Sequence, residues 1–170
     1  MEPRGGSHDI AAITPSSAGG APAREHREAA TAGPDESPGF LLWRVTLRWQ
    51  RVIIAALRPL GLTHVQFVLL ASVWWLDSVA GEGPTQRRVA EHAGTDPMMT
   101  SQVLRALEAK RLVTREPDPD DSRARRVGIT PKGAALAQRA IAVVEAADAA
   151  FFAAAGERRA LLRMLHRLAG

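Results

Sequence analysis

The sequence predicts a mainly helical protein with one small β-hairpin. Apolar residues recur at helical spacing along most of the chain after residue 39, and Thr or Asp residues stand at several places where helices can begin. One stretch, residues 113–130, instead alternates apolar and polar residues around a Pro- and Asp-rich segment. With 170 residues, 46% of them apolar and 24% charged, the chain can form one domain with a sizeable core.

The first 38 residues differ from the rest in composition. They contain 5 of the 11 prolines and 5 of the 14 glycines, and they lack Leu, Val, Phe and Trp. Such a segment cannot bury enough apolar surface to offset the entropy lost on ordering. We expect residues 1–38 to be a disordered tail, with helix beginning near Pro38 and residues 39–170 forming the folded domain.

Two apolar helices are expected next. The first runs from Phe40 to Leu57 and is broken by Arg44, Arg48 and Arg51, which form one face of the helix. Residues 58–61 (Arg-Pro-Leu-Gly) end it, because Pro disfavours helix before itself and Gly permits the turn. Thr63 can cap the second helix, which reaches about Val79. This helix is apolar on nearly every side and is predicted to be the central buried one.

A pair of shorter helices follows a Gly-rich turn. Thr85 caps a helix through Ala93, and Gly94-Thr95 breaks the pattern. Asp96 then supplies a carboxylate at the N-cap and Pro97 occupies the first helical position, where no hydrogen-bond donor is lost. The second helix reaches about Lys110. Its predicted inner side carries Val103, Leu104 and Leu107.

The hairpin and two more helices complete the domain. Residues 113–116 and 124–130 are expected to be short strands, and the loop between them is too long for a tight turn and should project. Thr130-Pro131 opens a long helix to about Ala155, and Gly156 interrupts it. The final helix has an apolar stripe. It consists of Leu161, Leu162, Met164, Leu165 and Leu168.

This order of helix, short turn, helix and long-tipped hairpin is typical of a winged helix-turn-helix, which fits duplex DNA. A helix enters the major groove, where base edges can be distinguished, and the hairpin reaches the backbone or an adjacent minor groove. The outer side of the second helix carries Met98, Ser101, Gln102 and Arg105. Gln can pair with adenine and Arg with guanine or phosphate, while Ser and Met can also contact bases.

The hairpin tip adds a local cluster of arginines at Arg123, Arg125 and Arg126. An arginine gains energy from the enhanced negative potential of a narrow minor groove. The alternative is a solvated face on which these arginines pair with Asp118, Asp120 and Asp121. Separately, the helix pair and the hairpin are equally compatible with plain packing. Their occurrence in this order and at this spacing favours DNA binding.

The charge distribution agrees with an anionic partner. The net charge of +4 combines −3 in residues 1–39 with +7 in residues 40–170, and of the 22 basic residues only Lys110 and Lys132 are lysine. Arginine binds phosphates and base edges through a planar fork. The alternative is that arginine richness reflects genomic base composition.

Several motifs resemble those of the MarR family of winged-helix transcription regulators. They are residues 60–63 (Leu-Gly-Leu-Thr) before Gln66-Phe67, the run 100–108, and Asp121-Ser122-Arg123 ahead of residues 129–133 (Ile-Thr-Pro-Lys-Gly). The last looks like the family's wing signature, and the resemblance covers roughly residues 40–170. One departure is Arg111, which stands where the family usually has Gly.

The resemblance implies a homodimer that binds a pseudo-palindromic operator, with repression the commoner outcome in the family. Residues 39–62 and 131–170 would supply the dimerisation helices and residues 63–130 the winged-helix lobe. The apolar surface of the first and last helices independently predicts a partner. Because it belongs to the wing signature, Asp121 joins the predicted DNA-binding residues.

The resemblance also implies a ligand pocket between the dimerisation helices and the lobe. The candidate lining residues are Trp43, Arg48, His64, Trp74 and Trp75. Aromatic walls with one arginine suit an organic acid or a phenolic metabolite, which we expect to release the operator. The alternative is that the tryptophans fill the core or the dimer interface and that His64 only helps its helix to begin.

Other classes of function lack their motifs. The chain has no cysteine, and its five histidines show no metal-ligand spacing. No nucleophile elbow or phosphate loop is present, so we expect no enzyme and no cofactor. The longest nearly apolar run has 12 residues (65–76), and no secretory signal opens the chain, which predicts a soluble, cytoplasmic protein without membrane contact. A ligand-independent DNA-binding module, a protein-interaction module and a transcription activator remain alternatives.

Overall fold

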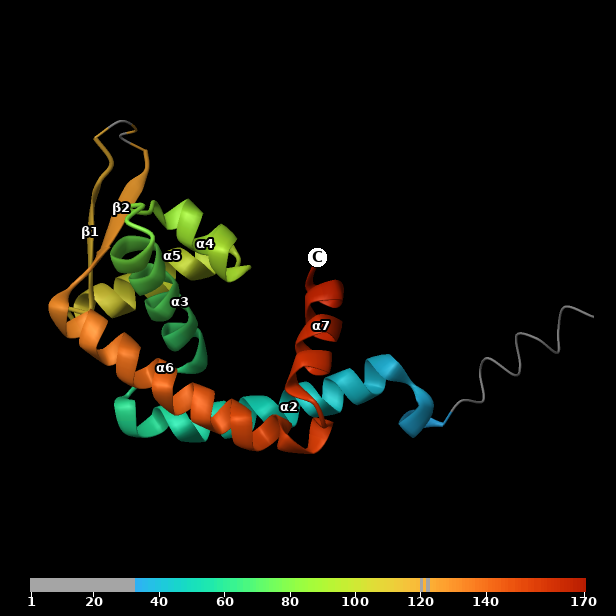
Figure 1. The fold of residues 1–170 in the computed structure, drawn as a ribbon. Helices are drawn as coiled ribbons and strands as arrows, with labels where there is room; N and C mark the ends of the chain where they lie inside the picture. The colour runs from blue at the N-terminus through green and yellow to red at the C-terminus, as the bar shows by residue number, and fades with distance from the viewer. Residues whose placement is uncertain (1–32, 120, 122) are drawn as a thin grey trace, which may run out of the picture. The chain divides into compact units, whose positions relative to one another are not determined.

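The computed structural model describes residues 33–119, 121 and 123–170 (Figure 1). The chain divides into two compact units, residues 1–42 and 43–170. In the first unit, the described residues form the 3₁₀ turn η1 (Pro34–Glu36) and the beginning of helix α2. The tail predicted to be disordered therefore lies mostly outside the described residues.

The first two long helices form as the sequence predicts. Helix α2 (Pro38–Leu57) passes into the 3₁₀ turn η2 (Arg58–Leu60), and Gly61 ends it with a left-handed φ of 65°. Helix α3 (His64–Trp74) begins with a reciprocal cap, in which Gln66 N donates to Thr63 Oγ1 (3.2 Å) and Thr63 N donates to Gln66 Oε1 (3.4 Å). This pair of bonds satisfies two backbone donors that would otherwise be unpaired at the helix start.

The last turn of this helical segment is wider than predicted. Residues Trp75–Val79 form the π-helical turn η3, in which Ala80 N donates to Trp75 O (2.9 Å). Helix α3 itself contacts α4, α5, α6 and the second wing strand, which confirms that it is the central helix. The π-helical turn places Leu76 in the core and Asp77 against that strand.

The helix-turn-helix follows its predicted capping chemistry. Helix α4 (Gln86–Ala93) begins at Thr85, whose Oγ1 accepts from Arg88 N (3.2 Å), and it ends at Gly94 with a φ of 62°. Helix α5 (Pro97–Ala109) begins at Asp96, whose Oδ1 accepts from Met99 N (2.9 Å). A tight turn therefore separates two helices whose starting points are fixed by local hydrogen bonds.

The wing is a two-stranded antiparallel hairpin. Strands β1 (Val113–Pro117) and β2 (Arg125–Ile129) pair in a register that runs from Val113↔Ile129 to Pro117↔Arg125. The hairpin projects beyond α4 and α5 (Figure 1). Inward positions on the two strands include the buried Val113 and Val127.

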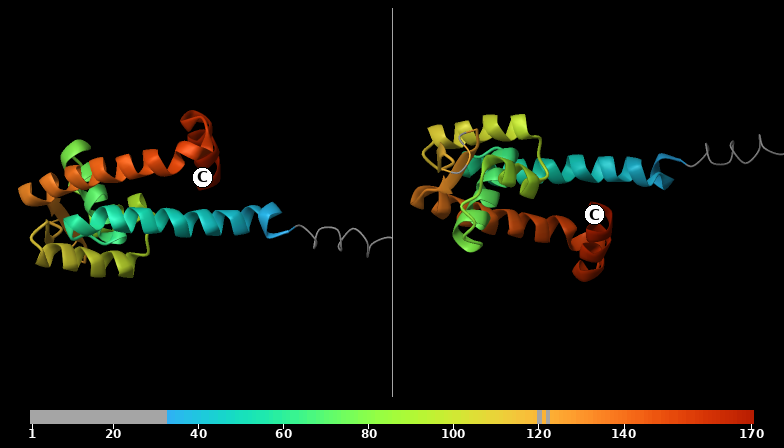
Figure 2. Two further views of the ribbon diagram at one scale, coloured as in Figure 1. Left: turned by 90° about the horizontal axis from the view of Figure 1, so that it is seen from below. Right: turned by 90° about the horizontal axis from the view of Figure 1, so that it is seen from above.

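Two C-terminal helices complete the second unit. Helix α6 (Pro131–Phe152) ends in the 3₁₀ turn η4 (Ala153–Ala155), Gly156 follows with a φ of 82°, and helix α7 (Arg158–Ala169) completes the chain. Within the second unit, α6 runs along α2 (Figure 2), and the indole Nε1 of Trp49 donates to Asp148 Oδ1 (2.7 Å) between them.

One core joins the helices to the wing. Its fully buried side chains come from α2, α3, η3, α4, α5, β2 and α6, and from the residue that precedes β1. They include Ile53, Leu57, Leu69, Leu70, Val73, Leu76, Val89, Leu104, Leu107, Leu112 and Val127. Gly133 lets α6 approach this core, because a Cβ there would lie 1.9 Å from Leu112 O. Of the helices that the structure describes, none alone has the length and apolarity of a membrane span, whereas Pro38–Leu60 and His64–Val79, bent by 72°, pass that test together.

Candidate nucleic-acid interface

Helix α5 has an inner face that fixes its position. Thr100, Leu104 and Leu107 are buried and follow one another at helical spacing. The Thr100 hydroxyl donates to Asp96 O (2.8 Å) and lies 2.8 Å from Thr95 Oγ1, so this polar group is satisfied although it is buried. The predicted inner residue Val103 is half-buried and packs against the core.

The outer face of α5 exposes the four residues predicted to read bases. Met98 is 73% exposed, Gln102 and Arg105 are exposed, and Ser101 is half-buried. Among the described residues, none forms a side-chain hydrogen bond or ion pair with Gln102 or Arg105. Their polar groups are therefore available to a partner in the groove that this helix would enter.

All three predicted arginines of the wing are exposed, but only two of them lack a side-chain partner in the described part of the wing. Arg123 and Arg125 are exposed, and no side chain in the described part of the wing pairs with either guanidinium. Arg126 instead donates from Nε to Oδ2 of the buried Asp118 (2.9 Å). The predicted alternative of an arginine paired with an aspartate thus holds at Arg126.

Asp121 shapes the wing turn. Its Oδ1 accepts from Arg123 N (2.9 Å), while its own backbone N–H donates to Asp118 Oδ1 (3.3 Å). These local bonds between aspartate side chains and the backbone are typical of turns. The two carboxylates hold the base of the loop from which Arg123 projects. Asp120 and Ser122 lie outside the described residues.

The candidate ligand residues are only partly brought together. His64 contacts Trp49 edge to face, with ring centroids 5.1 Å apart, and borders a surface depression of about 580 Å³ that Arg58 and Lys110 also line. Burial lowers the pKa of His64, and the Asp148 carboxylate opposes that shift. Trp43, Arg48, Trp74 and Trp75 do not line this depression.

The three tryptophans of the predicted pocket have different surroundings. Trp43 and Trp75 are exposed, whereas Trp74 is half-buried and packs against the core. Arg48 is exposed on α2. The aromatic residue that the structure places beside His64 is Trp49, which sequence reasoning missed. Its partner Asp148 is 99 residues away, so no local pattern signals the contact.

Comparison with known proteins agrees with this geometry. Residues 62–124 match the model of the MarR family. The transcriptional regulator YdcH of Bacillus subtilis is 42% identical over 137 residues, which are 81% of this chain and 92% of that protein. The chain belongs to the MarR family.

Solved structures of MarR-family proteins share the fold. The Mycobacterium tuberculosis protein Rv2887 in complex with DNA matches with a TM-score of 0.61 and 36% identity, covering 79% of this chain and 98% of that one. CouR from Rhodococcus jostii, bound to p-coumaroyl-CoA, matches with a TM-score of 0.68 and 28% identity, covering 81% and 93%. As a MarR-family member with this winged helix, the protein is a DNA-binding transcription regulator and not an enzyme.

Two further polar residues of the MarR lobe were not predicted. Asp77 accepts from the backbone N–H of Ile129 in β2 (2.7 Å), and Arg115 of β1 bonds to both α4 and α5. Arg115 had a sequence signal, because it follows Val113 at the alternating spacing that faces the core. Asp77 had none, since its partner is 52 residues away.

Proposed function

We propose that this MarR regulator is a repressor that binds a pseudo-palindromic DNA operator as a homodimer and is released by a small organic acid. The observation that carries the proposal is the unengaged outer face of α5, with Gln102 and Arg105, beside a wing that exposes Arg123 and Arg125. Gln and Arg on a helix can read base edges in the major groove, and exposed arginines beside it can bind the DNA backbone.

The repressor assignment draws on relatives. The Mycobacterium tuberculosis protein Rv2887, 38% identical over 137 residues, is named a transcriptional repressor. A repressor acts when its operator overlaps the promoter, and fragments selected from the source genome with the purified protein test this position directly. Operators upstream of the promoter, with loss of transcription on deleting the gene, would instead identify an activator.

The proposed roles of the DNA-facing residues differ. Gln102, Ser101, Met98 and Arg105 are assigned to base edges, and Arg123, Arg125 and Arg126 to the wing's backbone and minor-groove contacts. Asp121 is assigned to the wing turn that presents Arg123 to the DNA. Gln102→Ala should lower affinity by about 1–3 kcal/mol and relax the preference at one base pair. Arg123→Ala should weaken binding to all sequences and reduce the salt dependence by about one counterion.

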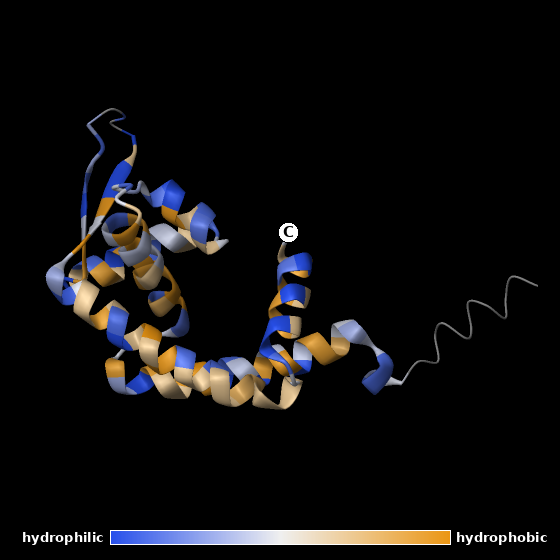
Figure 3. Ribbon diagram, viewed as in Figure 1, coloured by the Kyte–Doolittle hydropathy of each residue, from blue (hydrophilic) through white to orange (hydrophobic). Residues whose placement is uncertain are grey.

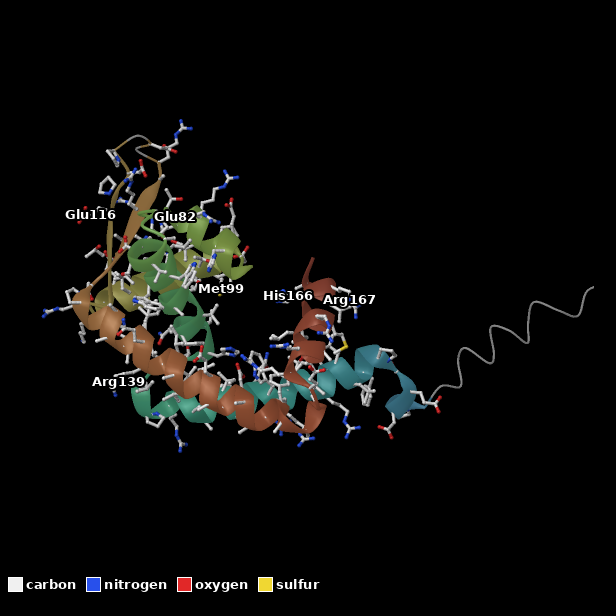
Figure 4. The ribbon with its side chains drawn as sticks, viewed as in Figure 1. Glu82, Met99, Glu116, Arg139, His166 and Arg167 are labelled. Atoms are coloured by element: carbon white, nitrogen blue, oxygen red, sulfur yellow. The ribbon has the colours of Figure 1, made fainter. Side chains whose placement is uncertain are left out.

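Fluorescence anisotropy against salt concentration, on operator and scrambled duplexes, separates these roles. Arg139→Ala is the matched control, since Arg139 is exposed on α6 away from the wing (Figure 4). Unchanged binding by both Gln102→Ala and Arg123→Ala would overturn the interface. A parent protein without preference for any duplex would favour a protein-interaction module instead.

The proposed domain boundaries assign dimerisation to residues 39–62 and 131–170 and DNA binding to residues 63–130. In support, α7 has no buried residue in the single chain, and hydrophobic and hydrophilic residues alternate around it (Figure 3). Exposed apolar side chains also occur on the neighbouring dimerisation helices. They include Val52, Ile54 and Val143. Such surfaces are typical of an interface between copies.

The effector proposal is an aromatic or phenolic carboxylic acid bound near His64. Rv2887 has been solved in complex with salicylic acid, which supports this chemical class. The predicted residues Trp43, Arg48, Trp74 and Trp75 would complete the site only if the partner subunit or a ligand gathers them. Titration with salicylate, following tryptophan fluorescence and operator release together, tests the proposal. No release by any phenolic or carboxylic ligand would favour a ligand-independent regulator.

A further inference from the structure

Arg115 occupies an unusual position in the wing. In β1, Val113 is buried, Thr114 is exposed, and the side chain of Arg115 is only 13% exposed, so it points toward the helices. Arginine is almost never buried unless it is paired. The inward position of this charge therefore requires an explanation.

The guanidinium joins three elements. Its Nη1 donates to Glu108 Oε2 on α5 (3.1 Å), and its Nη2 donates to Gln86 Oε1 on α4 (2.9 Å). Its Nε is buried and lacks a partner among the described residues. One side chain of the wing is thus bonded to both helices of the helix-turn-helix.

This arrangement does not primarily add stability. Burying a charge costs free energy, and a paired buried charge often contributes no more than an apolar residue of similar volume. The unpartnered Nε adds to that cost. The guanidinium instead fixes the orientation of the wing relative to the two helices. Its planar fork bonds two partners at once, whereas a lysine is a point charge on a flexible stem.

In the described part of the chain, the Arg115–Glu108 bond is the only side-chain hydrogen bond between α5 and the wing strands, whereas Asp77 and Pro84 O hold β2 from other elements. The packing of α5 against the wing is made by apolar side chains. They include Leu104, Leu107, Leu112, Val113 and Val127. Apolar contacts are not directional, so they leave freedom for the wing to tilt against α5. The bonds from Arg115 to Glu108 and Gln86 restrict this tilt on the side of the helix-turn-helix.

We propose that Arg115 is a positioning residue that sets the angle between the wing and the recognition helix without touching DNA. The proposal rests on the function proposed above, in which α5 and the wing engage neighbouring grooves of one duplex. A binding site loses affinity steeply when its parts are displaced by about 1 Å. Arg115 acts on affinity through the placement of Gln102 and Arg123.

The first test measures geometry without DNA. The chain has no cysteine, so Ala106→Cys on α5 and Glu116→Cys on β1 can be spin-labelled selectively. Both residues are exposed, and Glu116 points away from the helices (Figure 4). Labelled chains diluted with unlabelled ones report a single intramolecular distance by double electron–electron resonance. We expect a narrow distribution in the parent and a broader or shifted one in Arg115→Lys and in Glu108→Ala, which removes the acceptor oxygen.

The control is Arg139→Lys, the same substitution at an exposed arginine of α6, which should leave the distribution as in the parent. Glu108→Ala keeps the test informative if Arg115→Lys fails to fold, since it removes the acceptor and the Glu108 side chain is 41% exposed. Distributions identical to the parent in every variant that folds would overturn the proposal.

The second test measures binding. Arg115→Lys keeps the charge, so we expect about 10- to 100-fold weaker operator binding with little change in the affinity for scrambled DNA or in the salt dependence. The double variant Arg115→Lys/Glu108→Ala should lose no more than either single one. Equal losses on operator and scrambled DNA would indicate a phosphate contact and overturn the positioning role. If the function proposed above is wrong, the parent protein itself will show no preference for the operator. The two failures can therefore be distinguished.

Discussion

Arg111 is the only non-glycine residue in the described part of the chain with a positive φ, at 58°. It stands in the turn between α5 and β1, where the MarR resemblance leads one to expect Gly. The turn forms nevertheless, because Arg111 N donates to Glu108 O (2.8 Å) and Arg111 O accepts from the Thr130 hydroxyl (3.0 Å). The surrounding bonds therefore hold a conformation that costs an L-residue about 1–2 kcal/mol.

Arg111→Gly should raise the free energy of unfolding by about 0.5–1 kcal/mol, since relief of the left-handed strain exceeds the extra chain entropy of glycine. Urea denaturation measures this change. Arg111→Ala removes the same side chain but keeps the strain, so it should leave stability close to that of the parent. Equal effects of Gly and Ala would show that the turn stores no strain.

His64 makes stability depend on pH. Burial lowers its pKa below the ordinary value of 6.5, so the folded state favours the neutral imidazole more than the unfolded state does. The contribution of neutral His64 to the free energy of unfolding is complete above the unfolded pKa. It is lost as the pH falls through 6.5 toward the lower folded value. We expect the parent to lose more stability than His64→Gln between pH 7.5 and pH 5.5 in urea titrations. Parallel losses in the two proteins would rule out this linkage.

At the scale of elements, the outer edge of β2 is held by bonds from outside the hairpin. Val127 N donates to Pro84 O (2.8 Å), and Ile129 N donates to Asp77 Oδ2 (2.7 Å). Asp77 reaches the strand from the π-helical turn after α3, so the wing is fastened to the central helix. These two acceptors act as a third strand would, by pairing the free donors of an edge.

Asp77→Ala should leave the Ile129 N–H without its acceptor and cost about 1–3 kcal/mol. The loss should appear as faster amide hydrogen exchange at Val127 and Ile129. Asp77→Asn retains a carbonyl oxygen and is expected to preserve most of the protection. If Asp77→Ala exchanges like the parent at these amides, the carboxylate does not anchor the strand.

How well each element was predicted depends on how local its determinants are. The helix starts at Thr63, Thr85, Asp96 and Thr130 were predicted because each cap bonds a backbone N–H within three residues. The wing was predicted from the alternation of apolar and polar residues in two short segments and from a connecting loop too long for a tight turn. The π-helical turn was missed, since the contact it permits joins Asp77 to a strand far along the chain.

The same reasoning separates the DNA-facing residues from the ligand residues. The exposed face of α5 follows from helical spacing alone, so the surface positions of Gln102 and Arg105 were predictable. The environment of His64 is made by Trp49 and Asp148, which come from two other helices. Their proximity arises from tertiary packing, which composition and spacing do not encode. The DNA and ligand roles themselves stay predictions until binding is measured.

At the scale of the whole molecule, charge and apolar surface point to two kinds of partner. Residues 40–170 carry a net charge of +7, which favours encounter with DNA and predicts binding that weakens steeply with salt. The second partner is indicated by α7, where Leu168 is 74% exposed and Leu162 and Leu165 are also exposed. An isolated helix with this pattern lacks the packing that stabilises helices in proteins.

A second copy of the chain is the expected cover for this face, so Leu165→Glu should convert the dimer to monomer. A charge buried at the interface without a partner costs about 3 kcal/mol or more, and symmetry places two of them there. Multi-angle light scattering at micromolar concentration measures the change. Operator affinity should fall with it, because one subunit then reads a single half-site. Arg163→Glu, on the opposite side of α7, is the control and should remain dimeric; a Leu165→Glu dimer would place the interface elsewhere.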